Sequence, residues 1–300
     1  MVKFIPFYLI ILLGFVAARF LHAQKETVAK LLIYIIVPVV IFFGTLQVKL
    51  SVSVLSLPIL FFAICVILSL VFIWVGKKLW EPGDNTKNLL AFTAGSANTG
   101  YFGLPVGIMI FGNDAFGIIT LCTLGYVLFE NTLGFFITAR GNYSAKESFH
   151  KLLKIPTVYA FFLGVLVNFL HLDLGSVAIT AMENFKSAYT VLGMMMIGMG
   201  LAAARKSSFD FKLIFSSFTA KFIVWPLVMF AIIYLDKTYF HIYSEFVRNV
   251  LFYMSVLPLA ANTVTFATEL NVKPEKAAVA VLLSTVFVLF YIPFMMSFIL

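Results

Sequence analysis

Charge is what this sequence has least of. Asp, Glu, Lys and Arg make up 11% of its 300 residues, against about 25% in soluble globular proteins. A soluble fold of this size cannot cover its surface with so few charges, and a disordered chain carries more of them. The composition therefore excludes a soluble globular protein, a disordered chain and a nucleic-acid-binding protein.

Cysteine is scarce as well. Cys65 and Cys122 lie inside apolar runs with no CxxC or Cys/His spacing, so we interpret them as buried thiols. This excludes a disulfide-rich secreted scaffold. The four histidines show no metal-ligand spacing, and the chain contains no GxxxxGK[ST] phosphate loop. We expect no metal, no cofactor and no ATP hydrolysis by that route.

Apolar residues are what the sequence has instead. They form 62% of the chain, with 35 Phe and a mean hydropathy of +1.05. The chain is therefore expected to be an all-α polytopic membrane protein. A spanning helix needs about 20 mainly apolar residues. Ten stretches meet this need: 4–22, 31–48, 54–76, 88–111, 115–139, 156–171, 187–204, 213–235, 248–268 and 277–299.

The 21 basic residues fall unevenly on the two sides that these spans define. Five lie on one side and one lies within a span, while 15 lie on the other. Because cytoplasmic loops collect positive charge, the richer side is cytoplasmic and both termini lie outside the cytoplasmic membrane. The first stretch is read as a retained span rather than a cleaved signal. The cytoplasmic set is Arg19, Lys25, Lys30, Lys77, Lys78, Lys87, Arg140, Lys146, Lys151, Lys154, Arg205, Lys206, Lys212, Lys273 and Lys276.

Residues 151–300 repeat features of residues 1–150. Five spans in each half, an odd number, place the second copy upside down in the bilayer. Inverted repeats of this kind are typical of transporters, whose substrate sites lie near the membrane midplane where helices are interrupted. Ile5-Pro6, Gly14 and Phe20-Leu21-His22 recur as Ile155-Pro156, Gly164 and Phe169-Leu170-His171.

Spans four and nine carry the features of such interruptions. Asn98-Thr99-Gly100 stands ahead of Pro105 in the first, and Pro258 stands ahead of Asn262-Thr263 in the second. Proline removes a backbone hydrogen-bond donor. Unwound backbone in the middle of the membrane is stable only where it lines a cavity or is enclosed by protein. An ordinary proline kink is the alternative. Two matching sites in inverted halves favour a substrate site.

The run NTGYFGLP at 98–105, the ten spans and the basic mid-chain loop resemble the auxin efflux carrier family. The resemblance covers essentially the whole chain, without the long cytoplasmic loop of many plant members. Bacterial members include permeases proposed for malate, malonate and related carboxylates. The resemblance implies that broken spans four and nine cross in a transport domain (spans 3–5 and 8–10). This domain moves against a scaffold (spans 1, 2, 6 and 7).

The crossing would be rich in hydrogen-bond donors. Half-helix ends present N–H groups and partial positive charge, to which the Asn98 and Asn262 carboxamides and the Thr99 and Thr263 hydroxyls add donors. Neither motif contains Arg or Lys. Such a pocket suits a carboxylate that must be released again.

Two charges lie inside spans, where charged residues are costly and usually functional. Glu130, beside Asn131 in span five, is either a proton-coupling site or a member of a structural pair. Lys221 in span eight is interpreted as snorkelling to the interface. A substrate contact or a partner for Glu130 is the alternative.

These features predict a secondary transporter, not an enzyme, that moves a small organic anion by alternating access with proton coupling. A sodium-coupled carrier or cation/proton antiporter is the alternative. It is disfavoured because such proteins typically place several acids near the crossover, and we expect none at this crossover. A membrane-embedded enzyme would need a catalytic cluster within its spans, and the sequence contains none. A receptor function remains an alternative. The expected partners are the anion and the lipid bilayer, and a homodimer is a further expectation.

Overall fold

The computed structural model describes residues 5–46, 52–112, 114–154, 156–170, 172, 175–202 and 208–298. Over these ranges every regular element is helical. The first half contains α1 (Ile5–Phe20), α2 (Lys25–Leu31), the π-helical turn η2 (Leu32–Ile36), α3 (Val37–Leu46), α4 (Val52–Leu79), α5 (Thr86–Gly95), the π-helical turn η3 (Thr99–Gly103), α6 (Leu104–Phe111), α7 (Ala115–Phe129), the π-helical turn η4 (Glu130–Gly134), α8 (Phe135–Ala139) and α9 (Ala145–Leu153).

The elements of the second half are also helical. It contains α10 (Pro156–Phe169), α11 (Gly175–Ala202), α12 (Phe211–Thr219), the π-helical turn η6 (Ala220–Val224), α13 (Trp225–Leu235), the π-helical turn η7 (Asp236–Phe240), α14 (Glu245–Ser255), α15 (Asn262–Glu269) and α16 (Pro274–Met296).

Six of the described helices are long and apolar enough to cross a membrane. They fall in expected spans two, three, five, seven, eight and ten, and two shorter apolar helices fall in spans one and six. Spans four and nine are interrupted, so each of their pieces is too short to qualify. The all-helical polytopic class is confirmed, and the ten-span inverted repeat stays a prediction. The six are Lys25–Phe43, Ser56–Leu79, Ile118–Ala139, Thr180–Ala202, Phe211–Phe240 and Pro274–Met296.

Two connections between the expected spans contain helix. Expected spans six and seven leave 172–186 as a loop, which is wrong because α11 already begins at Gly175, and its polar first turns hold an ion pair of Lys186 with Glu183 at 3.8 Å. The mid-chain loop contains the amphipathic helix α9. Its start is a capping box, in which Ser144 Oγ accepts from the Glu147 N–H while the Glu147 carboxylate accepts from the Ser144 N–H.

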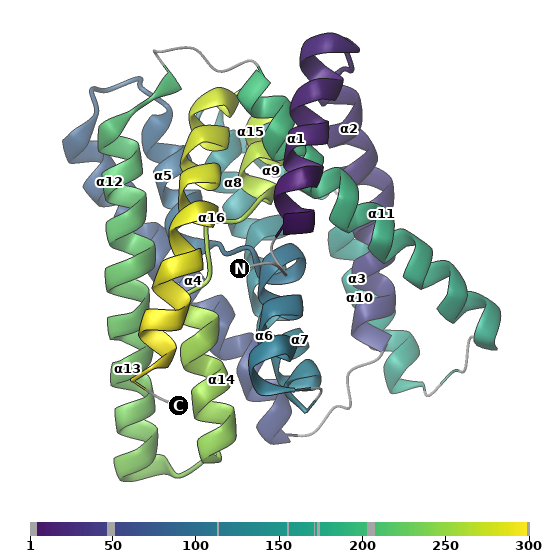
Figure 1. Ribbon diagram of the computed structural model, residues 1–300, viewed down its shortest axis with the longest axis vertical. Helices are drawn as coiled ribbons and strands as arrows, with labels where there is room; N and C mark the ends of the chain where they lie inside the picture. Colours follow the sequence, from purple (N-terminus) through teal and green to yellow (C-terminus); the bar gives the residue numbers. More distant parts are fainter. Residues whose placement is uncertain are drawn as a thin grey trace.

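The helices pack as two groups that lie side by side (Figure 1). In one group α1 packs on α11 and α10 packs on α3. The α1–α11 contact is made backbone to backbone. A Cβ added to Gly14 would lie 2.1 Å from the Met195 carbonyl oxygen, and one added to Gly198 would lie 1.8 Å from that of Ile11. Any larger residue would push the two helices apart.

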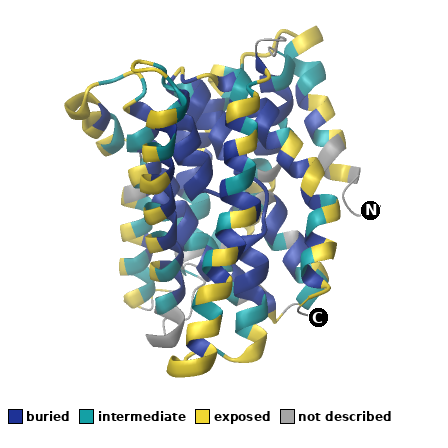
Figure 2. Cartoon of the chain, turned by 90° about the vertical axis from the view of Figure 1, so that its left-hand side faces the viewer, coloured by how far each residue is buried: buried dark blue, intermediate teal, exposed yellow. Residues whose placement is uncertain are grey.

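The other group holds α4 to α8 and α12 to α16, with the buried residues gathered along its interior (Figure 2). Large apolar side chains are exposed around the outside, as expected where lipid is the solvent. Two polar contacts join the groups near one end. Lys25 Nζ lies 3.2 Å from Glu275 Oε1, and Tyr34 Oη donates to Glu269 Oε1 at 3.2 Å.

Candidate functional site

The two helix breaks meet in the interior. Helix α5 ends at Gly95, residues 96–98 are non-helical with Ser96 extended, and η3 resumes the helical path. Helix α14 ends at Ser255, and α15 begins only at Asn262. The Asn98 N–H donates to the Pro258 carbonyl oxygen at 2.9 Å, so the breaks are in direct backbone contact. The breaks predicted from the sequence are therefore confirmed.

Neighbouring side chains satisfy the backbone that the breaks release. Pro258 has no N–H and lies in the non-helical segment, and the next N–H, of Leu259, donates to Ser284 Oγ of α16 at 3.1 Å. The Gly103 carbonyl accepts from Tyr253 Oη at 2.7 Å. Pro105 lies in the first turn of α6, where a missing N–H is tolerated. The breaks are thus built into the packing of the surrounding helices.

Several polar side chains at the crossing have no hydrogen-bond partner although they are buried. Native proteins leave few such atoms unpaired, because each one costs free energy. A cluster of them indicates a place where a ligand completes the hydrogen bonds. The atoms are Ser96 Oγ, Asn98 Nδ2 and Oδ1, Thr263 Oγ1, Thr265 Oγ1, Glu130 Oε1 and Lys221 Nζ.

An acid reaches the crossing from a neighbouring helix. Glu130 is 2% exposed, and its Oε2 accepts from Asn262 Nδ2 at 2.7 Å. Asn262 Nδ2 also lies 3.4 Å from Tyr189 Oη of α11. The expectation that the crossing holds no acid is therefore wrong. The motifs themselves contain none, but η4 places the Glu130 carboxyl beside the second one.

Lys221 does not snorkel to the interface. It is fully buried in η6, and its Nζ lies 4.3 Å from the ring centroid of Trp225 and 5.1 Å from that of Tyr126. The snorkelling interpretation is wrong because these rings hold the ammonium inside the helix bundle. Trp225 is itself fixed by a 2.7 Å hydrogen bond from its Nε1 to the Ala94 carbonyl, at the end of α5.

The other predicted residues have simpler surroundings. Thr99 is buried, and Gly100 faces α11, where an added Cβ would lie 3.5 Å from Tyr189 Cε1. Asn131 Nδ2 donates to the Val127 carbonyl of its own helix at 2.9 Å. This side chain is therefore occupied locally.

The expectation of free backbone N–H groups at the half-helix ends is partly wrong. The Thr99 N–H donates to the Ala97 carbonyl at 2.9 Å, and the Thr263 N–H donates to the Ala260 carbonyl at 3.1 Å. The backbone turns tightly enough at both breaks to use these donors itself.

Tyr189, Ser96, Tyr126 and Trp225 are site residues that sequence reasoning missed. Ser96 stands two residues before Asn98 within the Gly95–Pro105 run, and this position is the one signal available for it. Tyr189 lies on a different helix group from the motifs it faces. No spacing in the sequence connects it to Asn262.

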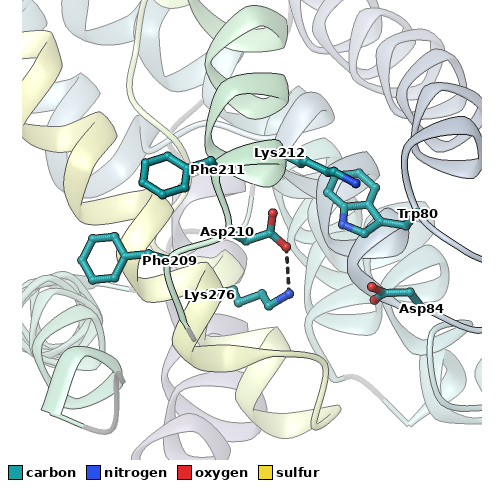
Figure 3. Close-up of a pocket in the computed structure, with 7 residues that line it drawn as sticks. All are labelled: Trp80, Asp84, Phe209, Asp210, Phe211, Lys212 and Lys276. Atoms are coloured by element: carbon teal, nitrogen blue, oxygen red, sulfur yellow. Dashed lines mark hydrogen bonds and ion pairs between the residues drawn. The ribbon is translucent and has the colours of Figure 1, made fainter. Parts of the chain in front are cut away.

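A hollow lies at the edge of the molecule, between the start of α12 and the turn after α4 (Figure 3). Its volume is about 330 Å³. Asp210 caps α12 through the Leu213 N–H at 3.0 Å and pairs with Lys276 at 2.8 Å. Desolvation raises the pKa of Asp210, but these hydrogen bonds outweigh it and hold the pKa below its ordinary value. Its carboxyl has a structural role.

The remaining acid of this hollow is also occupied. Asp84 Oδ1 accepts from the Thr86 N–H at 2.9 Å and from Thr86 Oγ1 at 2.7 Å, at the start of α5. Over the described ranges no group of three His, Cys, Asp or Glu side chains is placed to hold a metal ion. The crossing is therefore the candidate site.

A polytopic helical protein with two touching helix breaks and unpaired polar groups around them has the form of a membrane transporter. The sequence profile described as membrane transport protein matches residues 1–296. The chain belongs to this family, the auxin efflux carrier family, and the resemblance noted from NTGYFGLP is confirmed. It is also 27% identical to an uncharacterized transporter of Methanocaldococcus jannaschii over 297 residues, 95% of this chain and 94% of that protein.

Proposed function

We propose that this membrane transport protein is a secondary transporter that carries a small organic anion, a carboxylate, by alternating access. The observation that carries the proposal is the cluster of unpaired polar atoms where the two breaks meet. Asn98 Nδ2, Ser96 Oγ and Thr263 Oγ1 are buried donors without a partner. A carboxylate is acceptor-only and can take hydrogen bonds from several donors at once. Neutral donors hold it without the tight grip of a bidentate arginine.

The proposed architecture has ten spans in two inverted repeats, 1–150 and 151–300, with broken spans four and nine. The scaffold comprises α1, α2–α3, α10 and α11, and the transport domain comprises α4 to α8 and α12 to α16. The packing of the helices into two groups supports this division. Tyr189 of the scaffold reaches Asn262 of the transport domain, as expected of a site that opens and closes at their boundary.

Coupling is assigned to Glu130. Its Oε2 is held by Asn262 and its Oε1 has no partner, so this carboxyl can take up or release a proton next to the substrate site. Protonation of an acid beside a bound anion removes a repulsion between two negative charges. An inward proton gradient would then drive accumulation of the anion.

A cation-coupled carrier is the second candidate, and the position of Glu130 favours it. A carboxylate at a helix crossing, with one oxygen unpaired, can also ligate Na⁺ together with carbonyl and amide oxygens. Dependence of uptake on a sodium gradient, at constant pH on both sides, distinguishes this candidate from a proton-coupled carrier.

The anion is identified by thermal shift of the purified protein against a panel of mono- and dicarboxylates. Counterflow of the labelled carboxylate in proteoliposomes then separates a carrier from a receptor. A carrier exchanges labelled for unlabelled substrate across the membrane, whereas a receptor binds it without exchange. A shift from no carboxylate in the panel, or binding without counterflow, would contradict the proposal.

Orientation is proposed from the uneven distribution of basic residues, with both termini outside and the 140–155 segment in the cytoplasm. Lys146→Cys in a cysteine-free background tests it, because Lys146 is exposed on α9. Ser148, two residues on, is fully buried and serves as the unreactive control position. An impermeant thiol reagent should label Lys146→Cys only after the cells are opened. Labelling in intact cells would reverse the orientation.

A further inference from the structure

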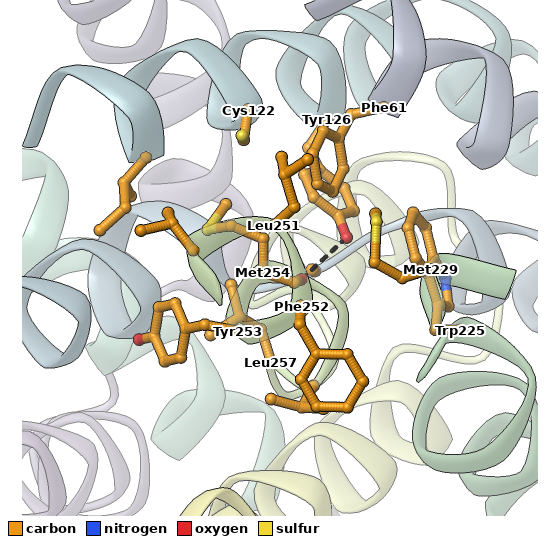
Figure 4. Packing of buried hydrophobic residues seen from close by; sticks show 14 of the residues in the cluster. Phe61, Cys122, Tyr126, Trp225, Met229, Leu251, Phe252, Tyr253, Met254 and Leu257 are labelled. Atoms are coloured by element: carbon orange, nitrogen blue, oxygen red, sulfur yellow. Dashed lines mark hydrogen bonds between the residues drawn. The ribbon is translucent and has the colours of Figure 1, made fainter. Parts of the chain in front are cut away.

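Lys221 is a buried cation without a hydrogen-bond partner. Its Nζ faces the rings of Trp225 and Tyr126, and no acid lies within ion-pairing distance in the described part of the chain. Tyr126 and Trp225 are held in place by neighbours, with Tyr126 Oη donating to the Met254 carbonyl at 3.1 Å (Figure 4). The ammonium therefore has a fixed position but no counter-charge in contact.

Glu130 is the nearest candidate for that counter-charge. Tyr126 and Glu130 are four residues apart on one helical path, so their side chains lie on the same face, with Cβ atoms about 6 Å apart. Lys221 Nζ lies 5.1 Å from the centroid of the Tyr126 ring, so the ammonium faces the side of this helix that carries Glu130 one turn further on. The two groups interact electrostatically through the protein interior. Glu130 Oε1, like Lys221 Nζ, is unpaired.

The other titratable groups around them are neutral at neutral pH. These groups are Cys65 of α4, which lies near both charges, Tyr126, which lies beneath the ammonium, and Tyr189 of α11, which shares Asn262 with Glu130. Thiols and phenols ionise only well above pH 7. The third buried charged residue among the described ones is Asp236, which pairs with Arg248 at 2.8 Å. Glu130 and Lys221 thus determine the charge of the crossing.

We propose that Lys221 is the counter-charge of Glu130 and that it makes proton binding and anion binding cooperative. With Glu130 ionised, the two residues sum to zero. With Glu130 protonated, the crossing carries one net positive charge, which attracts an anion. One proton then accompanies one monocarboxylate, and the loaded site is electrically neutral. The pairing does not depend on the proposed function, whereas the cooperativity rests on the proposed transport of carboxylates.

The expected size of the effect is that of two unit charges separated by on the order of 10 Å. At the effective dielectric constant of about 20 that suits protein sites, such charges change each other's binding equilibria roughly 15-fold. Removing the Lys221 charge should therefore weaken anion binding by about 10–100-fold. It should do so even when Glu130 is held neutral.

The pairing is tested without any substrate by a double-mutant cycle of melting temperatures at pH 7 in detergent. The variants are Glu130→Gln, Lys221→Met and the double variant. Each single change leaves one buried charge uncompensated, so the double variant should melt roughly 3–6 °C higher than the sum of the single losses implies. Additive losses would overturn the pairing. If Lys221→Met alone fails to fold, Glu130→Gln in the same chain should restore folding, and failure to do so would overturn it as well.

Lys78 provides the matched control. Its Nζ lies 3.5 Å from the ring centroid of Trp74, so it also makes a cation–π contact, but on the surface of α4. Lys78→Met combined with Glu130→Gln should give additive losses. Lys221→Arg keeps the charge and should preserve the non-additivity seen against Glu130→Gln. Non-additivity at Lys78, or additivity for the arginine variant, would contradict a specific charge pair.

Cooperativity is tested with radiolabelled lactate, which carries one negative charge. Lactate should bind to Glu130→Gln about 10–100-fold more tightly than to the double variant with Lys221→Met. Equal affinities would overturn the cooperativity. If the wild-type protein binds neither lactate nor any other carboxylate of the panel, the proposed function fails and the cooperativity fails with it. The melting-temperature cycle decides the pairing in either case.

Discussion

Two buried acids in this molecule have opposite surroundings. Asp236, at the turn between α13 and α14, accepts from the Ile242 N–H at 2.9 Å, the Tyr243 N–H at 3.4 Å and Arg248 Nε at 2.8 Å. Glu130, at the helix crossing, accepts from Asn262 Nδ2 on Oε2 and interacts with the Ala97 backbone N–H, while its Oε1 has no partner. The first arrangement fixes a turn. The second leaves one carboxyl oxygen without a partner, which is the arrangement that the proposed proton coupling requires.

The largest effect on transport is expected from substitution of Glu130. Glu130→Gln mimics the protonated acid, so it should abolish accumulation driven by a proton gradient while exchange of substrate for substrate continues. Uptake and counterflow in proteoliposomes measure the two activities separately. Glu183→Gln, at an exposed position of α11, is the control and should accumulate substrate normally. Accumulation by Glu130→Gln in response to a proton gradient would give Glu130 a structural role like that of Asp236.

Substitution of Arg248, the partner of Asp236, is expected to lower stability and leave transport unchanged. Arg248→Ala leaves a buried carboxylate without its counter-ion, which typically costs about 3–5 kcal/mol. The melting temperature in detergent should fall, while the protein that remains folded should transport at the wild-type rate. Alanine at the neighbouring exposed Lys237 should change neither quantity. A transport defect in folded Arg248→Ala protein would extend the functional region beyond the crossing.

Asn98 and Asn88 allow the same comparison, between a site residue and a structural residue, within one residue type. Asn98→Ala removes an unpaired donor, so substrate affinity should fall by about 1.5–3 kcal/mol, roughly 10–150-fold, at nearly unchanged stability. Asn88 Nδ2 donates to the Ile137 carbonyl at 2.8 Å, so Asn88→Ala should lower the melting temperature and spare affinity. Isothermal binding and thermal melting on the same preparations measure both. Normal affinity in Asn98→Ala protein would remove Asn98 from the site.

Asn262 should combine the two effects, since it holds Glu130 and also faces the site. Asn262→Ala is expected to weaken binding over the same range and, unlike Asn98→Ala, to lower the melting temperature. Asn98→Asp should weaken anion binding more than Asn98→Ala where the new acid is ionised. Identical behaviour of the Asn98 and Asn262 variants would show that the two breaks are functionally equivalent.

The smallest effect is expected at the edge of the molecule, where Lys276 pairs with Asp210. Because this pair is partly exposed, Lys276→Gln should cost less than about 1 kcal/mol at pH 7. The pKa of Asp210 is lower in the folded protein than in the unfolded chain, so its contribution is present above the unfolded pKa and is lost as the pH falls through the folded one. The difference between Lys276→Gln and wild type should therefore vanish in acid. A difference that persists there would have another origin.

The helices and their breaks could be predicted from the sequence better than the tertiary contacts between them. Pro258 and the glycine-rich run before Pro105 are local causes of helix breaks, and the breaks lie where these residues do. The helix inside the mid-chain loop also had a local signal, the Ser144 and Glu147 capping box. Lys221 was misinterpreted because the rings that bury it come from tertiary packing. The contact between Glu130 and Asn262 joins residues 132 positions apart, which no spacing rule reveals.

The contact between Lys25 and Glu275 links the two helix groups across their boundary. Any sliding of one group against the other separates these charges. Ion pairs of this exposure are screened by dissolved salt, over a Debye length of about 8 Å at physiological ionic strength. In the proposed alternating-access cycle this pair would break at each such movement, so we expect the turnover rate to depend weakly on ionic strength.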